Sequence, residues 1–80
     1  MTYDEVKAQL TQVFREVFDQ PTLALADATT AKEVEGWDSL AHVNLIVAAE
    51  KSFKTRFTTR EVQSLNNVGD FIRLIQRRCS

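Results

Sequence analysis

The sequence predicts an all-α fold: a small four-helix bundle with a long loop between the first two helices and a short third helix. Three observations support this fold class. Apolar residues recur at helical spacing in three segments, typical capping residues stand where those segments begin, and no segment has the alternation of a strand. With 80 residues, the chain forms one domain (1–80), near the low end of what folds unaided.

The first predicted helix covers residues 3–18. Thr2, with Glu5 three residues later, has the spacing of a capping box, and Pro21 is expected to stop the helix. One apolar stripe predicts its buried side, made of Tyr3, Val6, Leu10, Val13, Phe14 and Val17.

A long segment without helical period follows, from Asp19 to Asp38. Loops of this length in a compact domain are unusual, and they are often functional or held down by their own apolar residues. We expect Leu23, Leu25 and Val34 to hold this loop against the core.

The second predicted helix covers residues 39–53, with Asp38 as its N-cap. It has two apolar faces, which is unusual for so small a domain. The face assigned to the core consists of Leu45, Ile46, Ala49 and Phe53. A second stripe, Leu40, Val43 and Val47, lies nearly opposite and begins beside Ser39. This stripe is either a surface for binding a partner or is covered by the long loop.

Two further helices complete the fold. Thr58 and Glu61 have capping-box spacing and predict a short helix through about Ser64. Asn67 caps the last helix. The buried face of that helix is predicted to contain Val68, Phe71, Ile72 and Ile75.

Composition argues against several classes of protein. The net charge is −1, and the basic side chains are scattered among acids, so no nucleic-acid partner is expected. No apolar run is long enough to span a bilayer, and no signal-peptide pattern precedes residue 20, so no membrane insertion is expected. The single cysteine fits a reducing compartment. We therefore expect a cytoplasmic protein. No His, Cys or carboxylate cluster has metal-ligand spacing.

The segment GWDSL at residues 36–40 resembles the attachment motif of acyl carrier proteins and related peptidyl carriers. The resemblance extends over nearly the whole chain, including AAEKSF at 48–53 and NNVGDF at 66–71. It implies that a phosphopantetheinyl transferase attaches 4′-phosphopantetheine covalently to Ser39, and that acyl groups are then held as thioesters on the arm. It also implies that Asp38 helps to hold the metal ion of the transferase.

The same resemblance implies a carrier, not an enzyme, and therefore no catalytic residues. Its partners would be an acyl-loading ligase or acyltransferase and the downstream synthase enzymes, which it meets as a monomer. The partner-binding residues would be Leu40, Val43 and Val47, with Trp37 beside them.

The second helix departs from the pattern of fatty-acid carriers, which are strongly acidic there. Ala41 and Asn44 occupy positions that are often acidic in that family, and Lys51 follows Glu50. A helix with so few acidic residues would complement the basic docking surface of a fatty-acid enzyme poorly. We therefore expect a specialised lipid or polyketide-type pathway, with a peptidyl or aminoacyl carrier as the alternative.

Simpler interpretations remain open for some of these residues. Ser39 can be an ordinary helix-entry serine, and the chain can be an unmodified helical interaction module. Trp37 can simply cover the junction between loop and helix, and His42 is expected to be a packed or partly exposed histidine.

Overall fold

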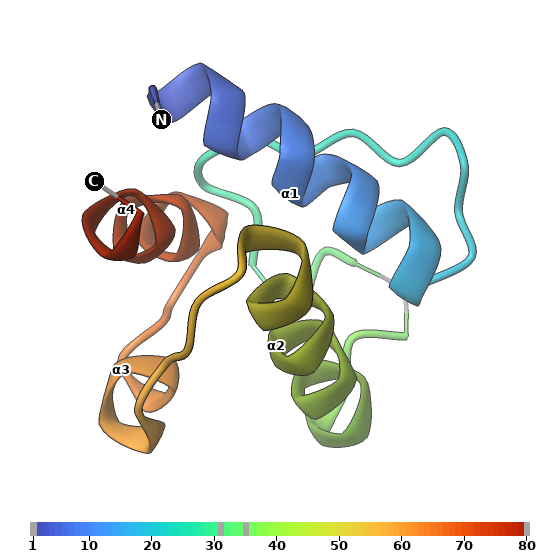
Figure 1. The fold of residues 1–80 in the computed structure, drawn as a ribbon. Coiled ribbons are helices and arrows are strands. Elements are labelled where there is room, and N and C mark those ends of the chain that lie inside the picture. The colour runs from blue at the N-terminus through green and yellow to red at the C-terminus, as the bar shows by residue number, and fades with distance from the viewer. Residues whose placement is uncertain (1, 31, 35, 80) are drawn as a thin grey trace.

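A computed structural model describes residues 2–30, 32–34 and 36–79. Over these residues it contains four helices and no strand: α1 (Tyr3–Val17), α2 (Ser39–Phe53), α3 (Thr59–Gln63) and α4 (Val68–Arg78). Figure 1 shows α1 lying across α2 and α4, with α3 set apart on the connection between them. The predicted fold class and the order of its helices are confirmed.

Local capping explains where three of the helices begin. Thr2 and Glu5 form the predicted capping box of α1, with the Glu5 N–H donating to Thr2 Oγ1 over 3.2 Å. Thr58 and Glu61 form the second box, at α3. At α4 the N–H of Asp70 donates to the side chain of Asn67 over 2.8 Å. Each cap satisfies a backbone donor that the helix itself leaves unpaired.

The core lies where α1, α2 and α4 meet. Both predicted core faces are confirmed: Leu45, Ile46, Ala49 and Phe53 of α2 are buried, as are the four apolar residues predicted for α4. On α1, Tyr3 and Val17 are only half-buried, because they stand at the ends of the predicted stripe. The fully buried side chains of α1 are Val6, Leu10 and Phe14.

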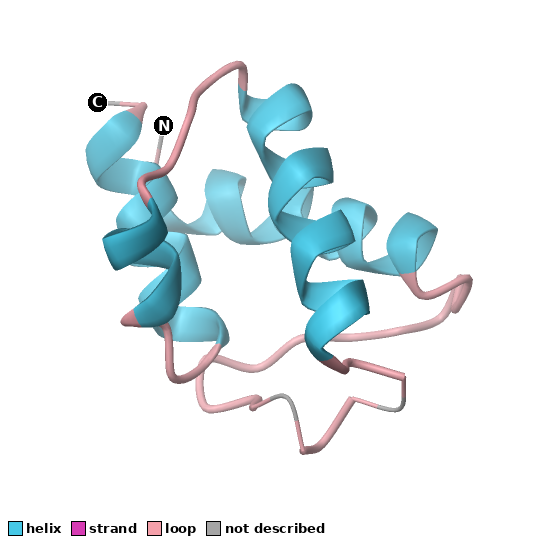
Figure 2. Ribbon diagram, turned by 90° about the horizontal axis from the view of Figure 1, so that it is seen from below, coloured by secondary structure: helices cyan, strands magenta, loops and turns pink. Residues whose placement is uncertain are grey.

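The long loop runs along one edge of the bundle, from the end of α1 past α4 and back to the start of α2 (Figure 2). Leu25 and Val34 are buried and Leu23 is half-buried. Leu25 belongs to the core cluster and Leu23 packs against it, so these two predicted contacts of the loop with the core are confirmed, whereas Val34 is buried outside that cluster. The loop also caps α4: the N–H groups of Val68 and Gly69 donate to the carbonyls of Thr29 and Asp27, both over 2.8 Å.

Gly69 leaves room for this close contact. A Cβ atom there would lie 3.0 Å from the carbonyl oxygen of Asp27, closer than side chains normally approach a backbone atom. The missing side chain therefore lets the loop reach the end of α4, and the loop in turn fixes the path that leads to α2.

Side-chain contacts hold the short α3. Arg78 of α4 pairs with Glu61, and together with the Thr58 backbone this lowers the pKa of the Glu61 carboxyl to about 2. Glu50, near the end of α2, accepts a hydrogen bond from the N–H of Phe57 over 2.9 Å. None of the described helices is both long enough and apolar enough to cross a membrane.

Candidate functional site

The start of α2 presents an accessible serine. Asp38 is the N-cap, and its Oδ1 accepts a hydrogen bond from the N–H of Ala41 over 2.8 Å. Ser39 is the first helical residue and is exposed. The predicted cap and the predicted starting residue of the helix are therefore confirmed.

The hydroxyl of Ser39 differs from those of the other described serines. Ser64 donates to the carbonyl of Glu61 over 2.8 Å, and Ser52 Oγ accepts from Gln9 Nε2 over 2.9 Å. Ser39 makes no side-chain hydrogen bond to any residue that the structure describes. Ser39 is also exposed, so nothing described in the structure covers it.

The chain enters α2 through a tight turn. Gly36 has φ 87°, a left-handed conformation that glycine adopts without the steric cost of a Cβ. The N–H of Asp38 then donates to the Gly36 carbonyl over 3.0 Å. After this turn Asp38 and Ser39 are exposed. Trp37, which lies between Gly36 and Asp38, packs against the core.

Trp37 packs against α1. Its ring meets that of Phe14 edge to face, with centroids 5.2 Å apart, and lies 6.2 Å from that of Phe18. The half-buried indole thus covers the junction between loop and helix, which is the simpler of the two roles expected for it. Its ring is less available to a partner than the exposed side chains of α2.

Trp37 also bonds to His42. The indole Nε1–H donates to His42 Nδ1 over 3.0 Å, and the two rings are nearly parallel, at 18°. Because Nδ1 accepts this bond, the neutral imidazole carries its proton on Nε2. Burial lowers the pKa of His42 below its ordinary value, which favours this neutral form.

The sequence suggested a packed or partly exposed histidine, and His42 is half-buried. Its bond to Trp37 was not predicted. Their spacing in the sequence could have indicated this bond, because Trp37 directly precedes the N-cap and His42 lies in the first turn of α2.

The second apolar stripe of α2 is exposed. Leu40 is 72% exposed, Val43 59% and Val47 44%, so the long loop does not cover them. These three residues, called the apolar stripe below, begin next to Ser39 and follow the helix away from it. Isolated apolar side chains are common at protein surfaces, but three aligned on one helix form a contiguous patch.

The surroundings of Ser39 suit a phosphodiester with a flexible arm. An open hollow of about 380 Å³ is lined by Trp37, Asp38, Ser39 and His42. The N–H groups at the start of α2 and the positive end of its dipole favour a negatively charged group. Within the hollow, the one carboxylate is that of Asp38, and its Oδ1 is engaged by the N–H of Ala41.

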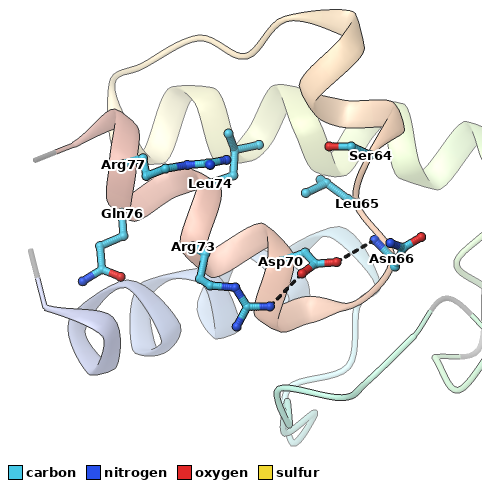
Figure 3. Close-up of a pocket in the computed structure, with 8 residues that line it drawn as sticks. All are labelled: Ser64, Leu65, Asn66, Asp70, Arg73, Leu74, Gln76 and Arg77. Carbon is cyan, nitrogen blue, oxygen red and sulfur yellow. Dashed lines mark hydrogen bonds and ion pairs between the residues drawn. The ribbon is translucent and has the colours of Figure 1, made fainter.

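A larger hollow of about 730 Å³ lies elsewhere, between the α3–α4 connection and α4 (Figure 3). Asp70 forms its polar centre, accepting from Arg73 over 2.7 Å and from the Asn66 N–H over 3.2 Å. These two contacts lower the pKa of Asp70. The hollow is thus organised around an internal ion pair, and Ser39 does not line it.

Comparison with known proteins addresses the same region. The family model described as "Phosphopantetheine attachment site" matches residues 8–75. The acyl carrier protein of Acidothermus cellulolyticus is 31% identical over 72 residues, which cover 90% of this chain and 86% of that protein. The solution NMR structure of the holo acyl carrier protein from Geobacter metallireducens superposes with a TM-score of 0.86 at 41% identity. That match covers 91% of this chain and 84% of the other.

Fold, family model and relatives agree. Proteins of this kind carry acyl groups on covalently attached 4′-phosphopantetheine, received from a phosphopantetheinyl transferase, and present them to acyl-handling enzymes. They are carriers and not enzymes. Since the matching model spans most of the chain and a relative matches over nearly its whole length, this chain belongs to the acyl carrier protein family.

Proposed function

We propose that Ser39 is the residue to which 4′-phosphopantetheine is attached. The observation that carries this proposal is the exposed hydroxyl at the first position of α2, which makes no hydrogen bond within the described residues. In the transfer, the Ser39 oxygen forms a bond to the phosphorus that carries pantetheine, and the phosphoanhydride bond of coenzyme A breaks. Adenosine 3′,5′-bisphosphate leaves, and the serine proton passes to a base of the transferase. The bound arm supplies a thiol that holds the acyl group as a thioester.

The helix start has two effects on the modified serine. Unpaired N–H groups and the helix dipole stabilise negative charge there. The cap formed by Asp38 fixes the direction in which Ser39 leaves the helix. The arm then lets the cargo search the active site of a docked enzyme at high effective concentration.

Asp38 is proposed to have a second role besides capping. Only its Oδ1 accepts a hydrogen bond from the described part of the chain, which leaves Oδ2 available. Carboxylate oxygens are suitable ligands for hard divalent cations. We therefore assign to Asp38 a contact with the metal ion of the transferase during the transfer.

The proposed partner surface is the apolar stripe. Enzymes that load or process the acyl group, an acyl-loading ligase or acyltransferase and the downstream synthases, would bind α2 through Leu40, Val43 and Val47. Trp37 would not contact the partner directly. Its packing against Phe14 of α1 would hold the start of α2 in place.

The pathway proposed is a specialised one of the lipid or polyketide type. Glu50 is the one acidic residue of α2, and its carboxylate is turned to the N–H of Phe57. A partner with a basic docking surface would therefore find little to bind on this helix. An aminoacyl cargo is the alternative. The single cysteine also supports a reducing, cytoplasmic location.

Intact-mass measurement tests the attachment. The apo protein is incubated with coenzyme A and a broad-specificity phosphopantetheinyl transferase, and one phosphopantetheine should be added. Ser39→Ala should gain none, whereas Ser64→Ala, at another exposed serine, should be modified like the wild type. An unmodified wild type, or a modified Ser39→Ala protein, would overturn the proposal, and the former would favour an unmodified interaction module.

A further inference from the structure

The apolar stripe leads to a basic end of α2. Lys51 stands four residues after Val47, so it shares the side of the helix on which the stripe lies. Lys54 is the C-cap in a left-handed conformation, and Arg56 follows in the connection to α3. We call Lys51, Lys54 and Arg56 the basic end; all three are exposed.

Within the part of the chain that the structure describes, the charges of the basic end have no ion-pair partner. The described ion pairs involve Lys7, Arg73 and Arg78, and none involves the basic end. Glu50 lies next to Lys51 in the sequence, but its carboxylate accepts from Phe57 and is half-buried. The helix dipole accounts for a lysine in the last turn of α2. It also accounts for Lys54, which is the C-cap, but not for Arg56, which lies two residues beyond the C-cap.

The docking face of α2 is therefore apolar beside Ser39 and positive at its far end. Glu50, the one acidic residue of α2, is half-buried and accepts a hydrogen bond from the N–H of Phe57. The two features are separated along the helix: Lys51 lies twelve residues after Ser39, or about 18 Å at 1.5 Å per residue.

We propose that the enzymes using this carrier bind α2 with an apolar groove that has carboxylates at one end, about 18 Å from the entrance to their active site. The groove takes Leu40, Val43 and Val47, and the carboxylates face the basic end. The inference rests on the proposed attachment at Ser39, because that residue fixes which end of the helix faces the active site.

The apolar stripe and the basic end would have different roles in docking. Leu40, Val43 and Val47 lose apolar surface to water on docking, which holds the complex together. The basic end attracts the carboxylates at the end of the groove before the two proteins touch, which raises the association rate. The same attraction sets the direction in which α2 lies in the groove. Because these charges are exposed, salt weakens their effect, and at about 1 M salt the Debye length is only about 3 Å.

The test uses two synthetic amphipathic peptides of about 18 residues, long enough to span α2. Both carry the same apolar stripe, flanked by glutamates in one peptide and by lysines in the other. Amide chemical shifts of the isotope-labelled protein give the affinity and the site of binding. At low salt the glutamate peptide should bind α2 about tenfold more tightly, and this preference should vanish at about 1 M salt.

Charge variants sharpen the test. Lys51→Glu, Lys54→Glu and Arg56→Glu together should reverse the preference between the peptides. A control with the same total change in charge, Lys32→Glu, Arg60→Glu, Gln12→Glu and Gln63→Glu, uses exposed positions outside the described ion pairs, on the long loop, α1 and α3, and should keep the preference. Val43→Ser should weaken both peptides alike, and melting temperatures verify that each variant is folded.

Three results would overturn the inference: equal binding of both peptides, tighter binding of the lysine peptide, or no shift of α2 amides by the glutamate peptide. The peptides are tested on both the unmodified and the modified protein. Their preference is thus measured whether or not Ser39 accepts the arm. Failure of the modification would overturn the proposed function and with it the distance of about 18 Å to the active site, whereas failure of the charge preference would overturn the inference alone.

Discussion

At the scale of single residues, Asp38 combines a structural and a chemical task that substitution can separate. Asn keeps an oxygen that caps the helix, whereas Ala removes it. Asp38→Ala should lower the free energy of unfolding by about 1 kcal/mol and also slow the transferase reaction. Asp38→Asn should keep nearly the wild-type stability but still react slowly, because a neutral amide binds a divalent cation less well than a carboxylate.

Chemical denaturation and the initial rate of phosphopantetheine transfer measure the two effects for Asp38. Ser39→Ala sets the background rate. If Asp38→Asn is modified as fast as the wild type, the residue is a helix cap and has no part in binding the metal ion.

His42 makes the stability of the protein depend on pH. Burial lowers its pKa below the ordinary value of 6.5, so the folded protein binds this proton less well than the unfolded chain. The stability contributed by the neutral ring is complete above pH 6.5 and is lost as the pH falls through the pKa of the folded state. Protonation also turns Nδ1 into a donor, which breaks its hydrogen bond with Trp37.

The melting temperature should therefore fall between neutral pH and about pH 5, and His42→Asn should remove most of this dependence. The chain has one histidine, so an NMR titration of its ring assigns the effect directly. The carboxyls of Glu5, Glu61 and Asp70 also have lowered pKa values. They change the stability only below about pH 4.5, so they do not obscure the effect of His42. A His42→Asn protein with the same pH dependence as the wild type would contradict this assignment.

At the scale of helices, the surface of α2 is expected to decide which enzymes accept the carrier. Ala41→Asp with Asn44→Glu adds two acids on the first half of α2, where Asn44 is exposed and Ala41 half-buried. Acylation by fatty-acid enzymes with basic docking surfaces should become several-fold more efficient, mainly through faster association.

Specificity constants at low and high salt measure this gain, which salt should reduce. Gln12→Glu with Gln63→Glu adds the same charge on exposed positions of α1 and α3 and serves as the control. An equal gain in the control would show that total charge matters and its position does not. No gain in either protein would place partner choice outside α2.

Helices were predictable from the sequence because their signals are local. Thr2 and Glu5, or Thr58 and Glu61, are three residues apart, and each pair forms its capping box within one turn. The exposed stripe of α2 followed from helical period as well, although the period alone left open whether the loop covers it. Its exposure depends on the path of the loop, which has no period.

Contacts between distant segments were not predictable. The carbonyls of Asp27 and Thr29 reach the first N–H groups of α4 from about forty residues away in the sequence. Any residue type supplies a carbonyl, so nothing in the loop marks these two. Gly69 has a packing role that a sequence shows only as an isolated glycine. In the site, Ser39 and its cap were recognisable, but the bond between Trp37 and His42 needed the turn at Gly36.

At the scale of the whole molecule, the amount of exposed apolar surface bears on its oligomeric state. Stable protein–protein interfaces bury about 1,200–2,000 Å² in total, about 800 Å² from each partner. Three side chains that are each partly exposed offer much less than this. Among the described residues no other large apolar side chain is exposed, so the stripe has no large apolar extension.

We therefore expect a monomer, and sedimentation equilibrium should give the mass of one 9.1 kDa chain over a wide range of concentrations. Leu40→Ser with Val47→Ser should leave that mass unchanged while abolishing the binding of both amphipathic peptides, because the stripe serves transient docking and not self-association. A dimer that these substitutions dissociate would mean that a second copy covers the stripe. Each enzyme would then have to displace that copy before reaching Ser39, and the affinity of docking would fall as the carrier becomes more concentrated.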